Sequence, residues 1–454
     1  MKIFNTLSRR VEEFKPIKKG FVGLYTCGPT VYDFSHIGNF RTYIFEDLLR
    51  RTLEWNGFKV KQVMNITDVE DKIIKKAIEE SKTISEITLP YTRIFFSDLK
   101  DLNIEKAAVY PRATKHVKDM LRMVQALVEK GFAYRGKDDS VYFEIDKFPE
   151  YGKLAGLDKV TLKSGARVES DEYDKEEARD FVLWKAMKPK EPSWPSDFGP
   201  GRPGWHIECS AMSMRYLGPH FDIHTGGVDN IFPHHENEIA QSEASTGKPF
   251  VNYWMHSEHL MVNGEKMSKS LDNFYTLRDI KERGFEPLAF RYATLTTHYR
   301  SKMNFTWEAL EASQNALNNL RFEIAKLKMF AAESGRGSLD KENKFCSAFT
   351  EAVNNDLNVP EALGIAWQVV KDDSLSSKQK LGLLLDFDNI FGLGLKNVKK
   401  PVIPRKIKAI VKERELLRAN QQFVQSDALR KKIEALGYKL EDTENGPIVT
   451  EKIK

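Results

Sequence analysis

The chain has 454 residues, of which 41% are hydrophobic and 30% charged, with a formal net charge of +5. This composition is typical of a folded globular protein of several domains and excludes a disordered chain. Residues 1–10 lack the apolar core of a signal peptide and no run of about 18 apolar residues occurs, so we expect a cytoplasmic protein without membrane segments. The three scattered cysteines, Cys27, Cys209 and Cys346, argue against a disulfide framework and fit a reducing compartment.

The first motif that suggests chemistry is His36-Ile37-Gly38-Asn39, between an expected strand over 21–27 and an expected helix over 40–55. A second strand over 60–66 completes a parallel unit of the dinucleotide-binding type. Glycine lets the backbone approach a nucleotide, and histidine can donate a hydrogen bond to phosphate. Taken alone, the motif is equally compatible with an ordinary strand-to-helix turn.

The pattern then changes. Alternating apolar residues over 131–145 predict antiparallel strands, and the charged stretch 169–179 predicts an exposed loop. The parallel pattern resumes near Trp205, with a strand expected over 221–227 and a helix over 233–246. The predicted fold is therefore α/β, with a Rossmann-type nucleotide-binding catalytic domain in two halves (1–98 and 201–302), an insertion (99–200), a helical bundle (303–398) and a small C-terminal module (399–454).

The C-terminal residues 401–454 carry twelve Lys/Arg against eight Asp/Glu, so most of the net charge lies there. Such a module could contact the backbone of a nucleic acid. A solvated helical surface explains most lysine-rich tails, and composition alone favours that alternative.

Lys266-Met267-Ser268-Lys269-Ser270 follows the first motif by about 230 residues. Lys266 and Lys269 are ammonium groups on a loop flanked by small residues, suited to stabilising charge that develops on phosphate oxygens. Together with His36, they predict a site that stabilises ATP while its α-phosphate is attacked. The ordered pair of motifs resembles the signature of class I aminoacyl-tRNA synthetases.

Cys27, Cys209, His234 and Glu238 form a second constellation, which could bind a metal. His234 and Glu238 are four residues apart in an expected helix, so both face one side of it. We expect the two cysteines at the ends of separate strands of the sheet. Two thiolates, an imidazole and a carboxylate suit tetrahedral zinc. The spacing is not that of a zinc finger, so buried apolar cysteines and a surface His/Glu pair remain open as alternatives.

The chain resembles the cysteinyl-tRNA synthetases over nearly its full length. The matching segments are 24–33, the His36 motif, 65–73, 201–213, 226–238 and, near the end, 436–437 and 442–443. The family often has histidine at the fourth position of the first motif, where this chain has Asn39. The segment 420–423 departs further from the family, which leaves the tRNA contacts of the tail less defined.

The resemblance implies that the protein activates L-cysteine with ATP and Mg²⁺ and transfers it to the 3′-terminal adenosine of tRNA(Cys). It implies an ATP site formed by His36, Gly38, Asn39, Lys266, Ser268 and Lys269, of which His36, Asn39, Lys266 and Lys269 are catalytic. It places Trp205, Thr67 and Asp229 in the amino-acid pocket, although an aspartate beside Gly226-Gly227 is as often a turn former.

The resemblance also makes Cys27, Cys209, His234 and Glu238 the ligands of one zinc ion per subunit. A second layer of histidines would orient these ligands: His206, His224, His235 and His256. Because cysteine and serine differ by a single atom, a pocket that reads shape separates them by only ~1–3 kcal/mol. Binding the substrate thiolate to zinc would separate them by ligand softness instead.

For the C-terminal module, the residues expected near RNA are Arg414, Arg418, Arg430, Lys431 and Lys432. The resemblance suggests a monomer, and Cys346 is expected to be a buried apolar residue. Two other functions are compatible with parts of this sequence. One is a related ligase that attaches cysteine to a glucosaminyl-inositol amine but lacks the terminal module. The other is a non-catalytic RNA-binding homologue, which the complete set of motif residues argues against.

Overall fold

The computed structural model describes residues 1–157, 167–168, 180–267, 273–330, 344–400, 404–443 and 446–451. The loop expected over 169–179, together with Ser268 and Lys269, lies outside these residues. The chain forms two compact units. The first comprises Met1–Pro287, Thr297–Thr306 and Val353–Asn358, and the second comprises Leu288–Thr296, Trp307–Ala352 and Val359–Lys454.

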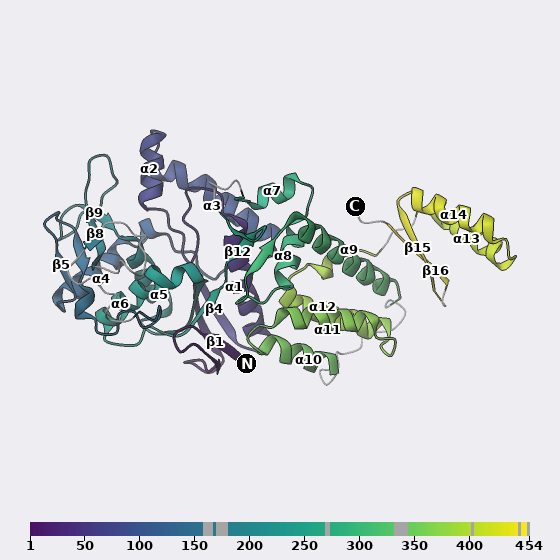
Figure 1. Ribbon diagram of the computed structural model, residues 1–454, viewed down its shortest axis with the longest axis horizontal. Coiled ribbons are helices and arrows are strands. Elements are labelled where there is room, and N and C mark those ends of the chain that lie inside the picture. The colour runs from purple at the N-terminus through teal and green to yellow at the C-terminus, as the bar shows by residue number, and fades with distance from the viewer. Residues whose placement is uncertain are drawn as a thin grey trace. The chain divides into compact units, whose positions relative to one another are not determined.

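A parallel sheet of four strands forms the centre of the first unit, in the order β11-β10-β3-β4. Figure 1 labels its edge strand β4. The strands are β3 (Phe21–Thr26), β4 (Lys59–Met64), β10 (Phe221–Gly227) and β11 (Val251–Ser257). Helix α1 (Ile37–Trp55) connects β3 to β4 and packs on the sheet. The strand order reverses between β3 and β10, which is where open parallel sheets bind ligands. The predicted α/β fold with a Rossmann-type sheet is confirmed.

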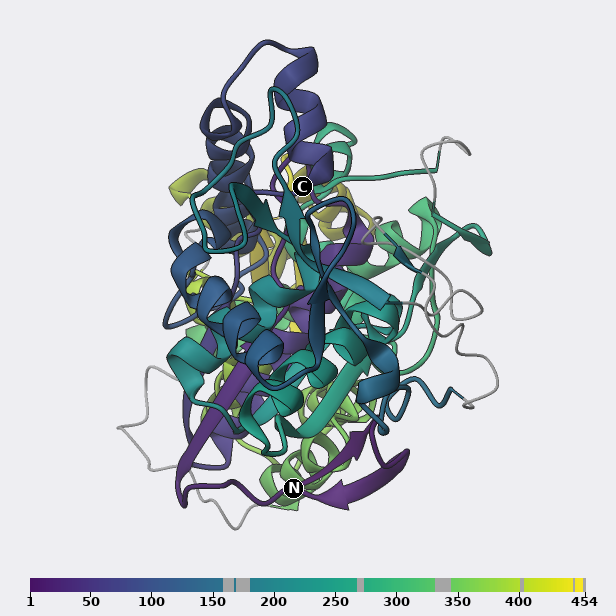
Figure 2. The ribbon, with the colours of Figure 1, turned by 90° about the vertical axis from the view of Figure 1, so that its left-hand side faces the viewer.

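Several helices and short strands follow β4 in the sequence, up to residue 203. They are α2 (Asp71–Glu79), α3 (Ile84–Asp101), α4 (Val117–Glu129), β5 (Ala133–Arg135), β6 (Val141–Phe143), β7 (Arg167–Val168), β8 (Asp180–Ala186) and β9 (Gly201–Pro203). Strands β5 and β6 pair antiparallel, which confirms the prediction from alternation over 131–145. Strand β8, which was not predicted, pairs antiparallel with β6. Helix α4 packs against the helices that follow β9 (Figure 2).

The segment that carries Cys209 is a helix, α5 (Trp205–Leu217), so the expectation that Cys209 ends a strand is wrong. All residues from His206 to Ser213 are buried, and the helix therefore lacks the polar face that would reveal it in the sequence. The helix expected over 233–246 begins with an irregular turn, Ile231–His235, and continues as α6 (Glu236–Thr246).

Three short strands follow the parallel sheet, and one of them contains Lys266, the first residue of the second sequence motif. Strand β12 (Leu260–Val262) lies between β13 (Glu265–Lys266), antiparallel to it, and β14 (Met303–Phe305), parallel to it. The first unit also contains the N-terminal hairpin β1 (Lys2–Asn5) and β2 (Arg10–Glu13) and the short helix α7 (Leu277–Glu282).

The second unit contains the predicted helical bundle and the C-terminal module. The bundle consists of α8 (Pro287–Leu295), α9 (Trp307–Phe330), α10 (Lys344–Asn354), α11 (Val359–Lys371) and α12 (Ser377–Phe391). Phe349 and Phe387 stack at a ring distance of 3.9 Å in its core. Cys346 on α10 is partly exposed, whereas we expected it to be buried. No helix in the described ranges has both the length and the apolarity needed to cross a membrane.

The C-terminal module consists of α13 (Arg405–Ala419), α14 (Phe423–Ala435) and the hairpin β15 (Tyr438–Thr443) and β16 (Gly446–Glu451). Its core contains Ile407, Ile410, Ile433, Leu440 and Val449. Arg414 is fully buried and donates two parallel hydrogen bonds to the Asp442 carboxylate, at 2.7 and 2.8 Å. This corrects the expectation that Arg414 faces RNA, because its guanidinium is already bound inside the module.

One buried carboxylate connects the insertion to α6. Glu236 is fully buried, and its two oxygens accept backbone N–H bonds from Gly152, Leu154 and Ala155 at 2.8 to 3.0 Å. Glu236→Gln replaces one accepting oxygen with an NH₂ group that faces these donors. We expect the free energy of unfolding to fall by about 2–4 kcal/mol, measured by urea denaturation. The exposed Glu413→Gln should change it by less than ~0.5 kcal/mol.

Candidate functional site

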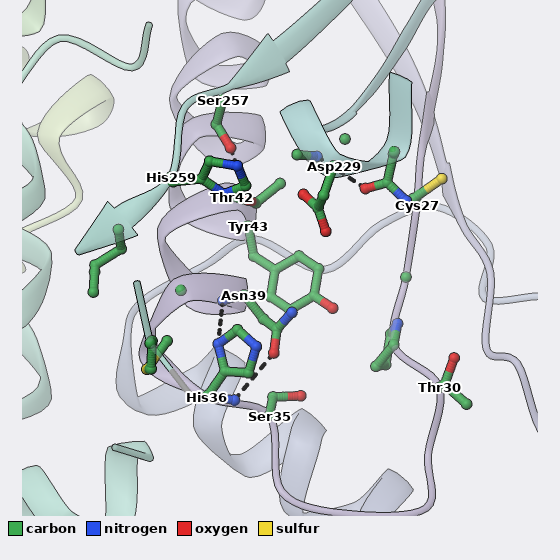
Figure 3. Close-up of a pocket in the computed structure, with 18 of the residues that line it drawn as sticks. Cys27, Thr30, Ser35, His36, Asn39, Thr42, Tyr43, Asp229, Ser257 and His259 are labelled. Atoms are coloured by element: carbon green, nitrogen blue, oxygen red, sulfur yellow. Dashed lines mark hydrogen bonds between the residues drawn. The ribbon is translucent and has the colours of Figure 1, made fainter. Parts of the chain in front are cut away.

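A cavity of about 470 Å³ opens at the carboxyl ends of β3 and β10, where the strand order reverses. Cys27 follows β3, Gly226 and Gly227 end β10, and the first turn of α1 closes a third side. Figure 3 shows the side chains of Asn39, Tyr43 and Asp229 projecting into this space. The cavity brings together residues that are more than 200 positions apart in the sequence.

His36 and Asn39 form a reciprocal cap at the start of α1 (Figure 3). The backbone N–H of Asn39 donates to Nδ1 of His36 at 3.2 Å, and the Asn39 side-chain oxygen accepts from the backbone N–H of His36 at 3.1 Å. Since Nδ1 accepts, the proton of the neutral ring lies on Nε2. The start of a helix also favours bound phosphate. His36 is thus held as a hydrogen-bond donor beside a site suited to anions.

Two glycines are required by close approach. A Cβ atom on Gly38 would lie 2.9 Å from Nδ1 of His36 and 3.1 Å from the Met267 methyl group, which leaves no room for a side chain. A Cβ on Gly28 would lie 1.7 Å from the Asn65 carbonyl oxygen. The Gly28 N–H instead donates to Oδ1 of Asn65 at 2.8 Å, which joins the loop after β3 to the segment after β4.

Lys266 ends β13 and lines the same cavity as His36 and Gly38. The backbone N–H of Ile37 donates to the Tyr275 carbonyl at 2.9 Å, so the chain returns to the His36 turn after the second motif. The positions of Ser268 and Lys269 lie outside the described residues. The two motifs predicted to act together therefore meet in one cavity through Lys266.

A buried cluster of possible metal ligands lies behind Cys27. The ligand atoms of Cys27, His234, His235 and Glu238 are all within 4.8 Å of one another. Three of these residues belong to the predicted ligand set, and His235 was expected in the second layer. Cys209 is not in this group, but its thiol is hydrogen-bonded to that of Cys27 and to His234.

The chemistry of this cluster fits zinc. Oε1 of Glu238 is buried with no hydrogen-bond partner among the described residues, although Nε2 of His234 lies 3.1 Å away. The hydrogen bond between the two thiols lowers the pKa of Cys209 to about 6 and raises the pKa of Cys27, so one thiolate forms readily. Thiolate, imidazole and carboxylate donors together are those that zinc prefers.

The other predicted histidines contact this cluster. His224 shares a hydrogen bond with Oε2 of Glu238 at 3.0 Å, and His206 shares one with His234 at 3.0 Å. His256 bonds Nδ1 of His235 at 2.8 Å, and its own Nδ1 bonds the Thr6 hydroxyl at 2.8 Å. Burial lowers the pKa of His256 to about 3, so its ring is neutral. These contacts fix ring orientations around the cluster, as outer partners do in metal sites.

The residues predicted for the amino-acid pocket divide into two groups. Trp205 and Asp229 line the cavity, and the Trp205 ring stacks on His234 at 4.3 Å. Thr67 does not line it, because its hydroxyl is buried and donates to Glu208 at 3.1 Å. The prediction for Thr67 is corrected accordingly.

Several lining residues were not predicted from the sequence: Thr42, Tyr43, Lys72, Glu258 and His259. Tyr43 lies four residues, or about one helical turn, after Asn39 in α1. The two residues therefore share a helix face, and this spacing could have predicted Tyr43 from the motif. Glu258 and His259 precede β12 and carry no local pattern that separates them from an ordinary loop.

Comparison with known proteins identifies this arrangement. Residues 13–315 match the family model described as the catalytic domain of class I (C) tRNA synthetases. Two solved structures share the fold: methionyl-tRNA synthetase of Mycobacterium tuberculosis in complex with methionyl-adenylate (TM-score 0.58, 15% identity, 82% of this chain and 90% of that one) and LeuRS of Agrobacterium radiobacter K84 in a ternary complex (TM-score 0.60, 10% identity, 85% of each). The chain has the fold of these synthetases, and the family model places its catalytic domain in class I of the tRNA synthetases.

Comparison with relatives in sequence shows which family of this class the chain belongs to. The chain is 47% identical to the cysteine–tRNA ligase of Brachyspira hyodysenteriae over 98% of both chains, and 48% identical to that of Chlamydia pneumoniae over 98% of this chain and 97% of that one. The chain belongs to the cysteine–tRNA ligase family of class I tRNA synthetases, as the sequence motifs predicted.

Proposed function

We propose that this ligase condenses L-cysteine with ATP to cysteinyl-adenylate and pyrophosphate, and then transfers the cysteinyl group to the 3′-terminal adenosine of tRNA(Cys). In the first step the cysteine carboxylate attacks the α-phosphorus and pyrophosphate leaves. In the second step a ribose hydroxyl attacks the adenylate carbonyl and AMP leaves. The observation that carries the proposal is a single cavity lined by Cys27 and Trp205 on one side and by His36 and Lys266 on another.

Positioning and charge stabilisation account for the first step, without a protein nucleophile. His36 donates from Nε2 toward the phosphates, and Asn39 holds that ring through the reciprocal cap. Lys266 supplies positive charge from the other side of the cavity. The motif assigns Ser268 and Lys269 to the same ATP site, where Mg²⁺ would neutralise charge on the leaving pyrophosphate.

For the amino acid, we propose that Cys27, Cys209, His234 and Glu238 hold one zinc ion. Zinc in this position would bind the substrate sulfur as a thiolate and so separate cysteine from serine. Trp205 forms the wall beside it through its stacking on His234. Asp229 lines the cavity and would accept from the substrate ammonium group.

The C-terminal module is proposed to contact tRNA through its exposed cations, Arg418, Arg430, Lys431 and Lys432. Replacing both Lys431 and Lys432 with alanine removes two charges from the surface of α14. We expect KM for tRNA to rise roughly tenfold. Its dependence on salt should weaken, because a protein that contacts fewer phosphates releases fewer counterions when it binds. Cysteine-dependent ATP–pyrophosphate exchange without tRNA should stay unchanged, and a fall in exchange would contradict this assignment.

We also propose that the protein is a monomer. Its domain boundaries are proposed at residues 98, 200, 302 and 398. Light scattering of the purified protein tests the monomer, and limited proteolysis tests the boundaries. A cytoplasmic location is consistent with the free thiols of Cys27 and Cys209, which lie side by side.

Charging of tRNA(Cys) transcript with labelled cysteine and ATP tests the proposed reaction. Parallel reactions offer serine as the amino acid, or glucosaminyl-inositol as the acceptor. Charging with cysteine and not serine supports both the acceptor and the discrimination. Acylation of the amino sugar alone would overturn the tRNA assignment, and equal charging with serine would overturn the thiolate-based selection.

A further inference from the structure

Arg41 on α1 connects two segments that lie far away in the sequence. It follows His36 by five positions, and its side chain is 4% exposed. Nη1 donates to the carbonyl oxygens of Glu258 and His259 at 2.6 and 2.5 Å. Nη2 donates to the carbonyl of His298 at 3.4 Å and to that of Ser301. One guanidinium thus binds four backbone carbonyls.

A buried guanidinium is costly unless a carboxylate or several hydrogen bonds compensate. Among the described residues no carboxylate forms an ion pair with Arg41, and burial lowers its pKa to about 10 although the Glu258 carboxylate acts in the opposite direction. The four carbonyls are therefore its compensation. Only a planar fork of five N–H donors can reach two pairs of carbonyls at once, which lysine cannot reproduce.

The four carbonyls stand where the small sheet begins. Glu258 and His259 both line the cavity and directly precede β12. The Glu258 N–H donates to the Tyr299 carbonyl at 2.8 Å, and the Met303 N–H donates to the His259 carbonyl at 3.2 Å. On the other edge of β12, Met261 pairs with Lys266. Arg41 therefore contacts the base of the hairpin that carries Lys266.

Asp356 also holds the segment 298–301, which provides two of these carbonyls. Asp356 accepts from the Tyr299 hydroxyl and from Nε of Arg300, both at 2.7 Å. Its backbone carbonyl shares a hydrogen bond with His298 at 2.8 Å. The segment that Arg41 binds is thus held between α1 and Asp356.

We infer that Arg41 is a positioning residue for adenylate formation: it sets the distance between His36, at the start of its own helix, and Lys266, on the hairpin whose base it binds. The inference rests on the proposed roles of His36 and Lys266 toward the phosphates. Misplacement of a charged group by about 1 Å can lower a rate on the order of 100-fold. Arg41 itself need not touch ATP or cysteine.

The test compares Arg41→Lys with Arg51→Lys. Arg51 is its match on the same helix: it is 8% exposed, donates to Asp47 at 2.8 Å and to the Asn103 carbonyl at 2.9 Å, and does not line the cavity. ATP–pyrophosphate exchange gives kcat and KM for cysteine and for ATP, and thermal unfolding gives Tm. We expect kcat of Arg41→Lys to fall about 100-fold with KM for cysteine unchanged. Arg51→Lys should lose a similar amount of Tm and keep its kcat.

Asp356→Asn provides a second variant that leaves Arg41 in place, in case Arg41→Lys does not fold. It weakens the outer support of the His298–Ser301 segment, and we expect kcat to fall about tenfold. Wild-type kcat in the folded Arg41 variant, or in Asp356→Asn when the Arg41 variant does not fold, would overturn the inference. So would an equal kcat loss in Arg51→Lys. Failure of the proposed function is distinguishable, because it would appear as full exchange activity in variants of His36 or Lys266.

Discussion

Replacing Cys27 with alanine is expected to abolish binding of the proposed zinc ion and to lower cysteine-dependent ATP–pyrophosphate exchange by about 10³-fold. The loss of a metal interaction with the substrate of ~4 kcal/mol corresponds to that factor. Cys27 is the natural choice because its thiol contacts both the cavity and the buried cluster. Metal content by atomic absorption and exchange kinetics of the same preparation measure the two effects together.

Measuring exchange with serine as well as cysteine shows whether the metal acts in amino-acid selection. Without the proposed zinc ion, the pocket would distinguish cysteine from serine only by shape, so the remaining exchange rates with the two amino acids should come within about tenfold of each other. Cys346→Ala is the matched control, since it removes a thiol from α10 in the second unit and should change neither metal content nor exchange. Undiminished exchange in a variant verified to be free of zinc would refute the assignment of the metal to substrate selection.

His36→Asn is expected to lower kcat for adenylate formation by ~10²–10³-fold, the usual effect of removing one hydrogen-bond donor that faces developing charge. Asparagine is among the best residues at the start of a helix, so this change keeps the cap and removes the ring. Tm, metal content and KM for cysteine should therefore stay close to those of the parent enzyme. His36→Ala, which also loses the cap, should additionally destabilise the protein by about 1 kcal/mol.

A second histidine provides the control for His36. His116 also precedes a helix, α4, but its ring bonds the Arg112 carbonyl and the Tyr216 hydroxyl, away from the cavity. His116→Asn should leave exchange unchanged. Equal activity losses in the two variants would indicate a general structural effect, and normal turnover of His36→Asn would exclude a role for the imidazole in catalysis.

The sequence predicted most of the fold because strands and half-buried helices leave a local pattern. The strands at 21–27 and 221–227 and the helix after His36 appear close to their expected bounds. Helix α5 could not be found in this way, since it is buried over His206–Ser213 and shows no polar face. Over a short apolar run, the sequence of a fully buried helix cannot be told from that of a fully buried strand.

In the candidate site, the residues found from the sequence belong to motifs with fixed spacing, such as His36-Asn39 and His234-Glu238. Arg41 could not be found, because its partners are backbone carbonyls, which any residue provides. Arg414 was misassigned for a related reason: its partner Asp442 is 28 positions away on a strand of the terminal hairpin. Whether a charged side chain is buried or exposed cannot be predicted from the sequence unless its ion-pair partner is known.

The contact between Gly28 and Asn65 limits how this sequence can drift over evolution. Even the methyl group of alanine at position 28 would overlap the Asn65 carbonyl oxygen, so no rotamer choice relieves the clash. In a saturation library at this position, every variant should be depleted, including the smallest. The Asn65 side chain holds the Gly28 N–H, so substitutions there should be purged together with those at Gly28. Two positions that follow different strands of the sheet should therefore be selected together.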